Sequence, residues 1–304
     1  MRLRALAPGK VNLCLFLGGT RADGRHDLVT LFQPVSLADE VSLETVDGSG
    51  ADVVVCPGVE GPNIVDGTLR ELRARGWGGP RVRVEIRKRI PVAAGMAGGS
   101  ADAAAVLRLA AAAHPLPGPE VAAEIARVLG ADVPSQLAPG PTLGTGAGDV
   151  ITAVPPRASH AAVILPSAER LSTAAVFDEA DRLGLVRSAV GLEDCRRELE
   201  AALRSGPELA PELLVNDLEP AARSLRPSID GGLTAAREIG ADAVLVCGSG
   251  PTVAGIFWGA DAAERARDGA AAAAERIPAA IAVIPVDAEF AIARDATCQP
   301  RPAQ

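Results

Sequence analysis

Residues 91–106 read PVAAGMAGGSADAAAV, so three glycines within five positions stand directly before an alanine-rich run. Glycine permits tight turns and alanine is the strongest helix former, so the stretch predicts a loop followed by a helix. A helix that starts at a glycine loop directs backbone N–H groups and its positive dipole end at one spot, which suits a phosphate. An ordinary loop entering a buried helix explains the same residues, because 32 of the 304 residues are glycine. Both interpretations stay open on this stretch alone.

The rest of the chain alternates between strand and helix patterns. In the first half, strand patterns occupy residues 11–17, 41–46 and 82–90, and helical spacing occupies residues 63–75, 101–113 and 120–129. Ser100 is a suitable N-cap for the alanine-rich helix, and Gly130 ends the next one. A glycine-rich hairpin at residues 139–156 ends in a proline pair. In the second half, strand patterns occupy residues 161–166, 242–247, 252–257 and 280–286, with helices up to Ile239 and at 262–276.

These patterns predict two mixed domains, residues 1–156 and 157–292, followed by a flexible polar tail at 293–304. The net charge of −8 and the aromatic content of 2% argue against a nucleic-acid partner, which would require a basic face and stacking rings. Five widely spaced cysteines without a CxxC pair favour reduced core thiols in a cytoplasmic protein. No stretch reaches the ~18 uncharged apolar residues of a membrane span, so no membrane contact is expected. We expect a monomer or a weak homodimer.

Common nucleotide and metal signatures are missing from the sequence. It contains no GxxxxGK[ST], no GxGxxG, no HRD and no DFG, which argues against a P-loop enzyme, a Rossmann dehydrogenase and a protein kinase. The histidines His26, His114 and His160 lie far apart without ligand spacing, which argues against zinc.

Lysine is scarce in this chain. Lys and Arg together number 30, yet only Lys10 and Lys88 are lysines, and tyrosine is absent. A bias of this kind replaces lysines that serve only as surface charges, so the two that remain suggest a chemical need for a compact ammonium group. Chance survival remains the alternative for each. Both lysines flank the candidate phosphate loop, Lys10 at the start of a strand and Lys88 three residues before Pro91.

Four ordered stretches, PGKVNLCLFLGGTRADGRHDLVTLFQPVSLAD, KRIPVAAGMAGGSADAAAVL, LGADVP and LVCGSGPTVAGIF, resemble the GHMP small-molecule kinases. NDLEP at residues 216–220 and LSTAAVF at 171–177 extend the resemblance, which runs from Ala7 to about Phe257. It implies an α+β fold with an N-terminal mixed α/β nucleotide domain and a C-terminal ferredoxin-like sandwich. It also implies ATP and Mg²⁺ as cofactors and a small-molecule alcohol as phosphate acceptor. The likeness is greatest to the branch that phosphorylates the 2-hydroxyl of a cytidine diphosphate-linked methylerythritol.

The resemblance also implies residue roles. Asp132 in GADVP is expected to be the catalytic base and Lys10 the lysine beside it, although an aspartate after glycine is often only a turn former. Ser100 is a candidate Mg²⁺ ligand. The residues expected to contact ATP are Asn63, Lys88, Pro91, Val92, Ala93, Ala94, Gly95, Met96, Ala97, Gly98, Gly99, Ser100 and Ala101. The residues expected to contact the acceptor are Asn12, Arg25, His26, Thr173, Phe177, Gly248, Ser249 and Gly250.

Four positions depart from the usual family pattern. Arg25 stands where the family has a tyrosine that stacks on cytosine, and Met96, Ala97 and Ala101 stand for Leu, Gly and Ser. An alanine in place of a loop glycine is tolerable only if φ is negative there. We therefore expect His26 and Phe177 to hold the base together with Arg25. A sister kinase for homoserine or a mevalonate, and a non-catalytic nucleotide-binding relative, remain alternative functions. The Gly248–Gly250 stretch can equally be a plain turn between strands.

Overall fold

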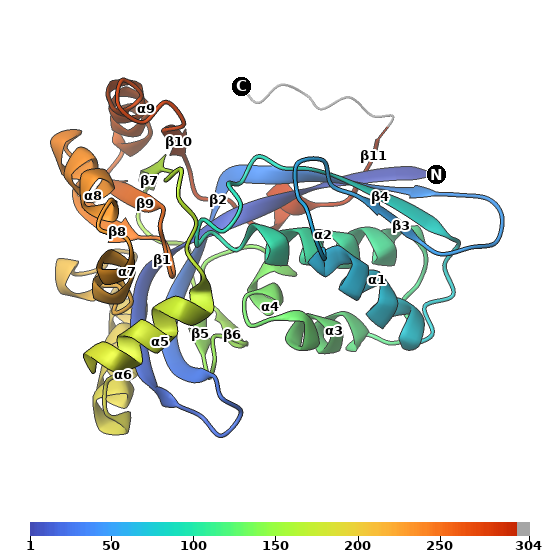
Figure 1. Cartoon of the computed structure of the whole chain (residues 1–304), viewed down its shortest axis with the longest axis horizontal. Coiled ribbons are helices and arrows are strands. Elements are labelled where there is room, and N and C mark those ends of the chain that lie inside the picture. Colours follow the sequence, from blue (N-terminus) through green and yellow to red (C-terminus); the bar gives the residue numbers. More distant parts are fainter. Residues whose placement is uncertain (297–304) are drawn as a thin grey trace.

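The computed structural model describes residues 1–296, which fold around two β-sheets (Figure 1). The strands are β1 (Arg2–Thr20), β2 (His26–Thr45), β3 (Val53–Val55), β4 (Val82–Arg87), β5 (Thr142–Thr145), β6 (Val150–Ala153), β7 (His160–Leu165), β8 (Ala243–Val246), β9 (Val253–Trp258), β10 (Ile281–Val283) and β11 (Arg294–Asp295). The helices are α1 (Ile64–Ala74), α2 (Gly98–Ala113), α3 (Val121–Leu129), α4 (Val133–Gln136), α5 (Thr173–Leu183), α6 (Ala189–Ser205), α7 (Glu219–Leu225), α8 (Ile229–Glu238) and α9 (Ala262–Ala273). Two short 3₁₀ helices cover Pro211–Leu213 and Ala288–Ala291.

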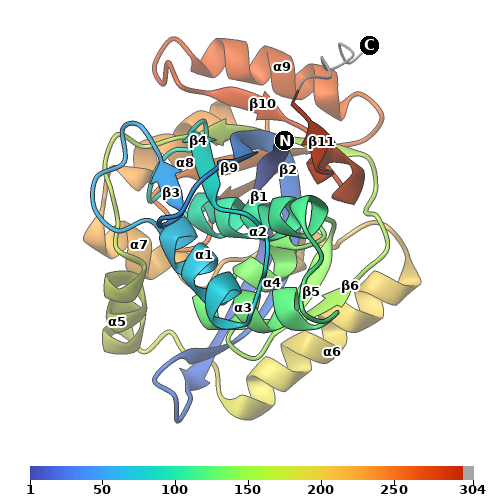
Figure 2. The same cartoon turned by 90° about the vertical axis from the view of Figure 1, so that its right-hand side faces the viewer.

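The larger sheet has the strand order β11-β1-β2-β4-β3, and β5 joins β2 while β6 joins β5. Its pairs are antiparallel except β3 with β4. Helix α2 lies against β1 and β2, and α1, α3 and α4 pack around α2 on that face (Figure 2). The smaller sheet has the order β10-β7-β9-β8 and packs against α8 and α9. The predicted α+β architecture of two mixed domains is confirmed.

Strands β1 and β2 are long enough to serve both halves of the molecule. Leu3 of β1 belongs to the core beneath α2, whereas Leu15 and Leu17 pack with β7, β8 and β9. The register of β1 against β2 shifts between Pro8 and Lys10 and again between Asn12 and Cys14. Irregularities of this kind bend a strand and redirect its side chains, which is why they occur beside functional sites.

Helix α2 begins at Gly98, so the expectation that it starts after Ser100 as N-cap is wrong. The residue before the helix, Ala97, adopts the left-handed conformation and turns the chain into the helix without a side-chain cap. Residues 101–107 are all buried because alanine is small enough to let α2 approach the sheet on one side and α1 on the other. The alanine-rich composition thus permits close packing around the helix.

The segment expected to be a flexible tail is paired at its start. Arg294 and Asp295 form β11 and pair with Arg4 and Leu3, because the edge of β1 offers unpaired backbone groups there. Residues 297–304 lie outside the described part of the chain. No helix within residues 1–296 combines the length and apolar character that a membrane crossing requires.

The cysteine expectation needs correction as well. Cys14 and Cys247 are buried, but Cys56 and Cys195 are only partly so, and Cys298 lies outside the described residues. Burial raises the pKa of the Cys14 and Cys247 thiols to about 12, which keeps them protonated and unreactive.

Candidate active site

A cavity of about 810 Å³ opens where the loop before α2 faces the β1–β2 hairpin, the β8–β9 turn and α5. Among the residues expected at a site, Met96, Ala101 and Gly250 do not line this cavity. The others all line it: Lys10, Asn12, Arg25, His26, Asn63, Lys88, Pro91, Val92, Ala93, Ala94, Gly95, Ala97, Gly98, Gly99, Ser100, Asp132, Thr173, Phe177, Gly248 and Ser249. The fold therefore gathers residues that are up to 239 positions apart, Lys10 and Ser249, around one cavity.

The glycine loop presses against the β8–β9 turn. A Cβ on Gly95 would lie 1.8 Å from the backbone oxygen of Cys247, so this contact requires glycine. Gly248 is equally restricted, because its Cβ would lie 2.9 Å from Gly95 O and 3.1 Å from Lys10 Nζ. The turn is held by Asn216 of the NDLEP stretch, whose Nδ2 donates to Val246 O at 2.8 Å and to Gly248 O at 2.7 Å. The Gly248–Gly250 stretch is thus a strand-to-strand turn, of which Gly248 and Ser249 also line the cavity.

The N-terminus of α2 faces the same cavity. The first hydrogen bond within the helix runs from Ala101 N to Ala97 O at 2.9 Å. The N–H groups of Gly98, Gly99 and Ser100 precede that bond and have no acceptor inside the helix. All three residues line the cavity, so donors and the positive dipole end coincide there. This geometry suits an anion.

Two alanines of the loop carry backbone strain. Ala93 has φ +57° and Ala97 has φ +55°, and both are left-handed conformations that favour glycine. The condition of negative φ for alanine at position 97 is therefore not met. The strain is tolerated because the flanking contacts of Gly95 and the start of α2 fix the loop.

Lys10 and Asn12 project from the irregular part of β1. Lys10 is only 4% exposed, and its Nζ donates to Asn12 Oδ1 at 2.7 Å and to Gly95 O at 3.0 Å. Asn12 Nδ2 donates in turn to Thr30 Oγ1 at 2.8 Å, and Thr30 Oγ1 donates to Cys14 O at 2.6 Å. The acceptors that surround the ammonium group are neutral. Thr30, which the sequence analysis missed, orients Asn12 from β2.

Asp132 stands immediately before α4, with a partly exposed side chain that lines the cavity. We expect it beside Lys10, but no ion pair joins the two within residues 1–296. The Asp132 side chain does not cap α4, so the turn-former interpretation does not explain it. Lys10 and Asp132 share one cavity without neutralising each other.

Lys88 is held by two buried carboxylates, which the sequence analysis did not identify. Its Nζ pairs with Asp39 and, at 2.8 Å, with Asp102 Oδ2. Burial lowers the pKa of Lys88, but the charges of Asp102 and Asp39 outweigh burial, so its net pKa is raised. Burial raises the pKa of Asp102 to about 7, because Lys88 offsets only part of the penalty and Asp39 adds to it. The cluster joins β2, the end of β4 and α2 behind the loop.

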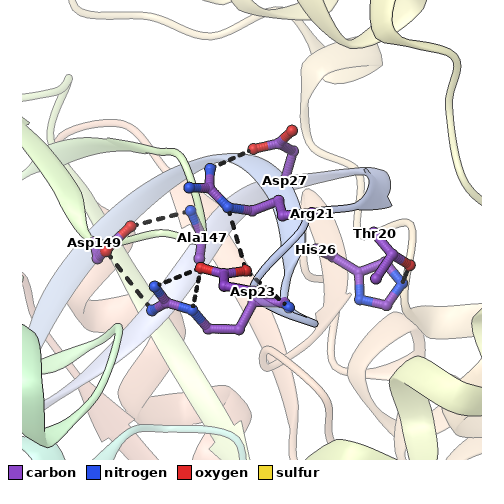
Figure 3. A network of polar contacts seen from close by, with 8 residues as sticks. Thr20, Arg21, Asp23, His26, Asp27, Ala147 and Asp149 are labelled. Atoms are coloured by element: carbon purple, nitrogen blue, oxygen red, sulfur yellow. Dashed lines mark hydrogen bonds and ion pairs between the residues drawn. The ribbon is translucent and has the colours of Figure 1, made fainter.

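The other end of the cavity lies at the tip of the β1–β2 hairpin, which the ion pair between Arg25 and Asp149 joins to the β5–β6 turn. Figure 3 shows the polar contacts at this tip, including the Arg21–Asp27 ion pair within the hairpin. Arg25 donates from Nε and Nη2 to Asp23 Oδ2 at 3.2 and 2.9 Å, and its Nη1 lies 3.6 Å from Asp149 Oδ2. Asp149 is fixed by Ala147 N, which donates to Oδ1 at 3.1 Å. The Arg25 side chain remains 46% exposed and lines the cavity.

Helix α5 presents residues at four-residue spacing to this end. Thr173 Oγ1 lies 3.0 Å from Ser249 Oγ, and the Phe177 ring centroid lies 5.0 Å from that of His26 at an interplanar angle of 32°. One turn further, Asp181 Oδ1 lies 2.9 Å from His26 Nε2. The sequence analysis missed Asp181, although the i, i+4, i+8 spacing of Thr173, Phe177 and Asp181 was a usable signal.

Both halves of the chain match family models. The GHMP kinases N terminal domain matches residues 63–154, and the GHMP kinases C terminal domain matches residues 196–276. The 4-diphosphocytidyl-2-C-methyl-D-erythritol kinase of Kineococcus radiotolerans is 42% identical over 273 residues, covering 86% of this chain and 83% of that protein. The protein of the same name from Mycolicibacterium gilvum is 44% identical over 269 residues, covering 84% and 82%.

Solved structures agree with the family models. A crystal structure of 4-(cytidine 5'-diphospho)-2C-methyl-D-erythritol kinase superposes with a TM-score of 0.72 at 32% identity, covering 93% of this chain and 98% of that one. A homoserine kinase from Cytophaga hutchinsonii reaches the same TM-score of 0.72 at 19% identity, covering 96% and 97%, and this likeness shows the fold alone. With two matching domain models and relatives above 40% identity over most of its length, this chain belongs to the GHMP kinases.

Proposed function

We propose that this chain is an ATP-dependent kinase that phosphorylates the 2-hydroxyl of 4-diphosphocytidyl-2-C-methyl-D-erythritol. The observation that carries the proposal is the Lys10 ammonium, buried beside the N-terminus of α2 with neutral hydrogen-bond partners. A buried charge is costly unless a counter-charge approaches it, and within residues 1–296 no carboxylate pairs with Lys10. A polyphosphate in the cavity supplies that counter-charge.

The γ-phosphoryl group is proposed to lie between Lys10 and the N–H groups that open α2. The hydroxyl oxygen of the acceptor attacks the γ-phosphorus while the bond from that phosphorus to the β–γ bridging oxygen breaks and ADP leaves. Asp132 accepts the hydroxyl proton, because its carboxylate lines the cavity without being neutralised by Lys10. Lys10 stabilises the charge that builds up on the transferring group.

Ser100 fits a role as Mg²⁺ ligand. Its hydroxyl is a hard oxygen donor in the first turn of α2 and lines the cavity. No cluster of three His, Cys, Asp or Glu side chains that could hold a metal occurs within residues 1–296, and Mg²⁺ bound mainly by phosphate and water oxygens needs none. When bound, Mg²⁺ neutralises phosphate charge. Asn63 and Lys88 line the cavity on the side proposed for adenine.

The cytidine end is proposed to lie at the hairpin tip. Phe177 offers one ring face, and the partly exposed Arg25 guanidinium is proposed as a second stacking surface in place of the usual tyrosine. His26, which packs against Phe177, reads the edge of the base. The relatives that carry the diphosphocytidyl name support this acceptor over homoserine or a mevalonate.

The test is an ATP-consumption assay of the purified full-length chain against the diphosphocytidyl substrate, homoserine and mevalonate. We expect ADP release only with the diphosphocytidyl substrate, and ³¹P NMR should show a new phosphomonoester on it. Turnover of homoserine or mevalonate instead would reassign the acceptor within the family. ATP binding without turnover of any alcohol would identify a non-catalytic relative.

A further inference from the structure

His26 contacts an acidic residue from a distant part of the chain. Its ring is 8% exposed, and Nε2 lies 2.9 Å from Oδ1 of Asp181, which is 155 residues away on α5. Thr20 Oγ1 lies 3.3 Å from the same nitrogen. The other ring nitrogen, Nδ1, forms no hydrogen bond within residues 1–296, and His26 lines the cavity. Nε2 of His26 is thus engaged in hydrogen bonding within the protein, and Nδ1 remains available to a ligand.

The chemistry of Asp181 decides which nitrogen carries the proton. An ionised carboxylate only accepts hydrogen bonds, so the neutral imidazole must donate from Nε2 to make the 2.9 Å contact. The tautomer follows from this pairing, as hydrogens are assigned from their hydrogen-bond network. With the proton on Nε2, Nδ1 holds a lone pair and acts as an acceptor.

We propose that Asp181 is a positioning residue that locks neutral His26 in the Nε2–H tautomer, so that Nδ1 accepts a hydrogen bond from the base of the substrate. The site then selects a base whose edge donates, such as the 4-amino group of cytosine, over one whose edge accepts, such as the 4-oxo group of uracil. This inference rests on the proposed function for the ligand, but the state of His26 does not depend on any ligand.

The selectivity has a physical cause. A 4-oxo group facing the Nδ1 lone pair places two acceptors against each other in a partly buried pocket, and neither is satisfied. Sites built around a specific hydrogen bond reject a mismatched analogue far better than apolar pockets do. We expect the wild-type enzyme to prefer the cytidine substrate over its uridine analogue by at least ~10-fold in kcat/KM.

The first experiment measures the tautomer directly in the ligand-free, full-length protein. The sequence contains three histidines, so ¹⁵N-histidine NMR at a pH where the ring is neutral resolves few signals, and a His26→Gln variant assigns those of His26. We expect a protonated Nε2 and an unprotonated Nδ1. In Asp181→Asn the amide can donate to Nε2 or accept from it, so the signals should shift toward the Nδ1–H form. A wild-type protein with the proton on Nδ1, or identical signals in both proteins, overturns the proposal.

The second experiment measures kcat/KM for the cytidine substrate and its uridine analogue. Asp181→Asn should lower the preference for cytidine several-fold, mainly through KM, with KM for ATP unchanged. Asp194→Asn removes an exposed carboxylate on α6 that does not line the cavity and should leave the preference as in wild type. Thermal unfolding confirms that both variants fold.

The kinetic results distinguish failure of the inference about Asp181 from failure of the proposed function. An unchanged preference in an active Asp181→Asn variant overturns the inference while the proposed function stands. A wild-type enzyme that phosphorylates neither nucleotide-linked alcohol overturns the proposed function, and the selection of the base falls with it. The NMR measurement then decides the tautomer on its own.

Discussion

Lys10 donates a hydrogen bond from Nζ to Oδ1 of Asn12 at 2.7 Å, two residues further along β1. The partner is a neutral amide, so the bond orients the ammonium group without cancelling its charge. Gly95 O, at 3.0 Å, provides a second neutral acceptor from the glycine loop. The positive charge is therefore fixed in place and available for an anion in the cavity.

Lys10→Arg should lower kcat by roughly 10²-fold or more, although this chain uses arginine almost everywhere else. The planar guanidinium is larger than an ammonium, and a Cβ on Gly248 would already lie 3.1 Å from Lys10 Nζ. Steady-state kinetics with the diphosphocytidyl substrate measures the effect. The Arg83→Lys exchange, at a partly exposed position on β4, serves as control and should be neutral. Full activity of Lys10→Arg would show that a point charge is not required.

Asp132→Asn should preserve the fold and ATP binding but lower kcat by ~10²–10⁴-fold, because the amide cannot accept the hydroxyl proton. ATP affinity from calorimetry and kcat from coupled turnover separate the two effects. Asp66→Asn, an exposed first-turn residue of α1, is the matched control and should stay within a few-fold of wild type. Turnover of Asp132→Asn at a similar level would exclude Asp132 as the base.

Arg25→Ala should raise KM for the diphosphocytidyl substrate by roughly 2- to 30-fold, the equivalent of a ~0.5–2 kcal/mol stacking contact. KM for ATP should change little. Arg25→Tyr should restore or lower KM for the nucleotide substrate, because a ring supplies the same stacking face without the ion pairs to Asp23 and Asp149. If neither substitution changes KM, the base does not contact residue 25 and Phe177 alone holds it.

Ala97→Gly should raise the free energy of unfolding by about 1 kcal/mol, since glycine adopts φ +55° without the penalty that alanine pays there. Chemical denaturation measures the difference. Ala111→Gly, at an exposed position of α2, is the opposite control and should lower stability by about 0.5–1 kcal/mol. Destabilisation by Ala97→Gly would mean that the loop is unstrained in solution.

Asp102 predicts a specific pH dependence of stability. Its pKa is about 7 in the folded chain and ~3.9 when unfolded, so between these values the folded state binds more protons. The contribution of Asp102 to the free energy of unfolding is therefore greatest below pH ~4. It falls as the pH rises toward 7, by at most about 1.4 kcal/mol per pH unit. Asp102→Asn cannot ionise, so its stability relative to wild type should rise from pH 5 to pH 8. Parallel denaturation profiles for the two proteins across that range would contradict the assignment.

The sequence predicts secondary structure best where an element depends on residues close to it in the chain. The apolar alternation of residues 82–90 and the helical spacing of 63–75 correspond to β4 and α1, because both patterns repeat over short distances. The predicted start of α2 at residue 101 is wrong by three residues, since Ala97 turns the chain through a strained conformation that propensity disfavours. The family resemblance predicts that Lys10 and Ser249 lie at one site, and both line the cavity. The strand and helix patterns of the sequence alone do not predict that these two residues come together.

Long-range contacts were the part that sequence reasoning missed. Asp39 stands outside the strand patterns of the sequence, and its pairing with Lys88 across 49 residues follows only from the folded sheet. The contact between His26 and Asp181 spans 155 residues. Arg294 and Asp295 read as polar tail, but the open edge of β1 supplies partners that the local sequence does not show.

Because β1 and β2 contribute to the cores of both halves, cutting the chain at residue 156 would not give two domains that fold independently. A fragment ending there would expose Leu15 and Leu17, whose packing partners lie on β7, β8 and β9. The complementary fragment would lose from its core the side chains that β1 and β2 contribute to it. The chain should therefore unfold in one cooperative transition. A ligand that binds Lys10 on β1 should stabilise the C-terminal half of the chain against unfolding as much as the N-terminal half.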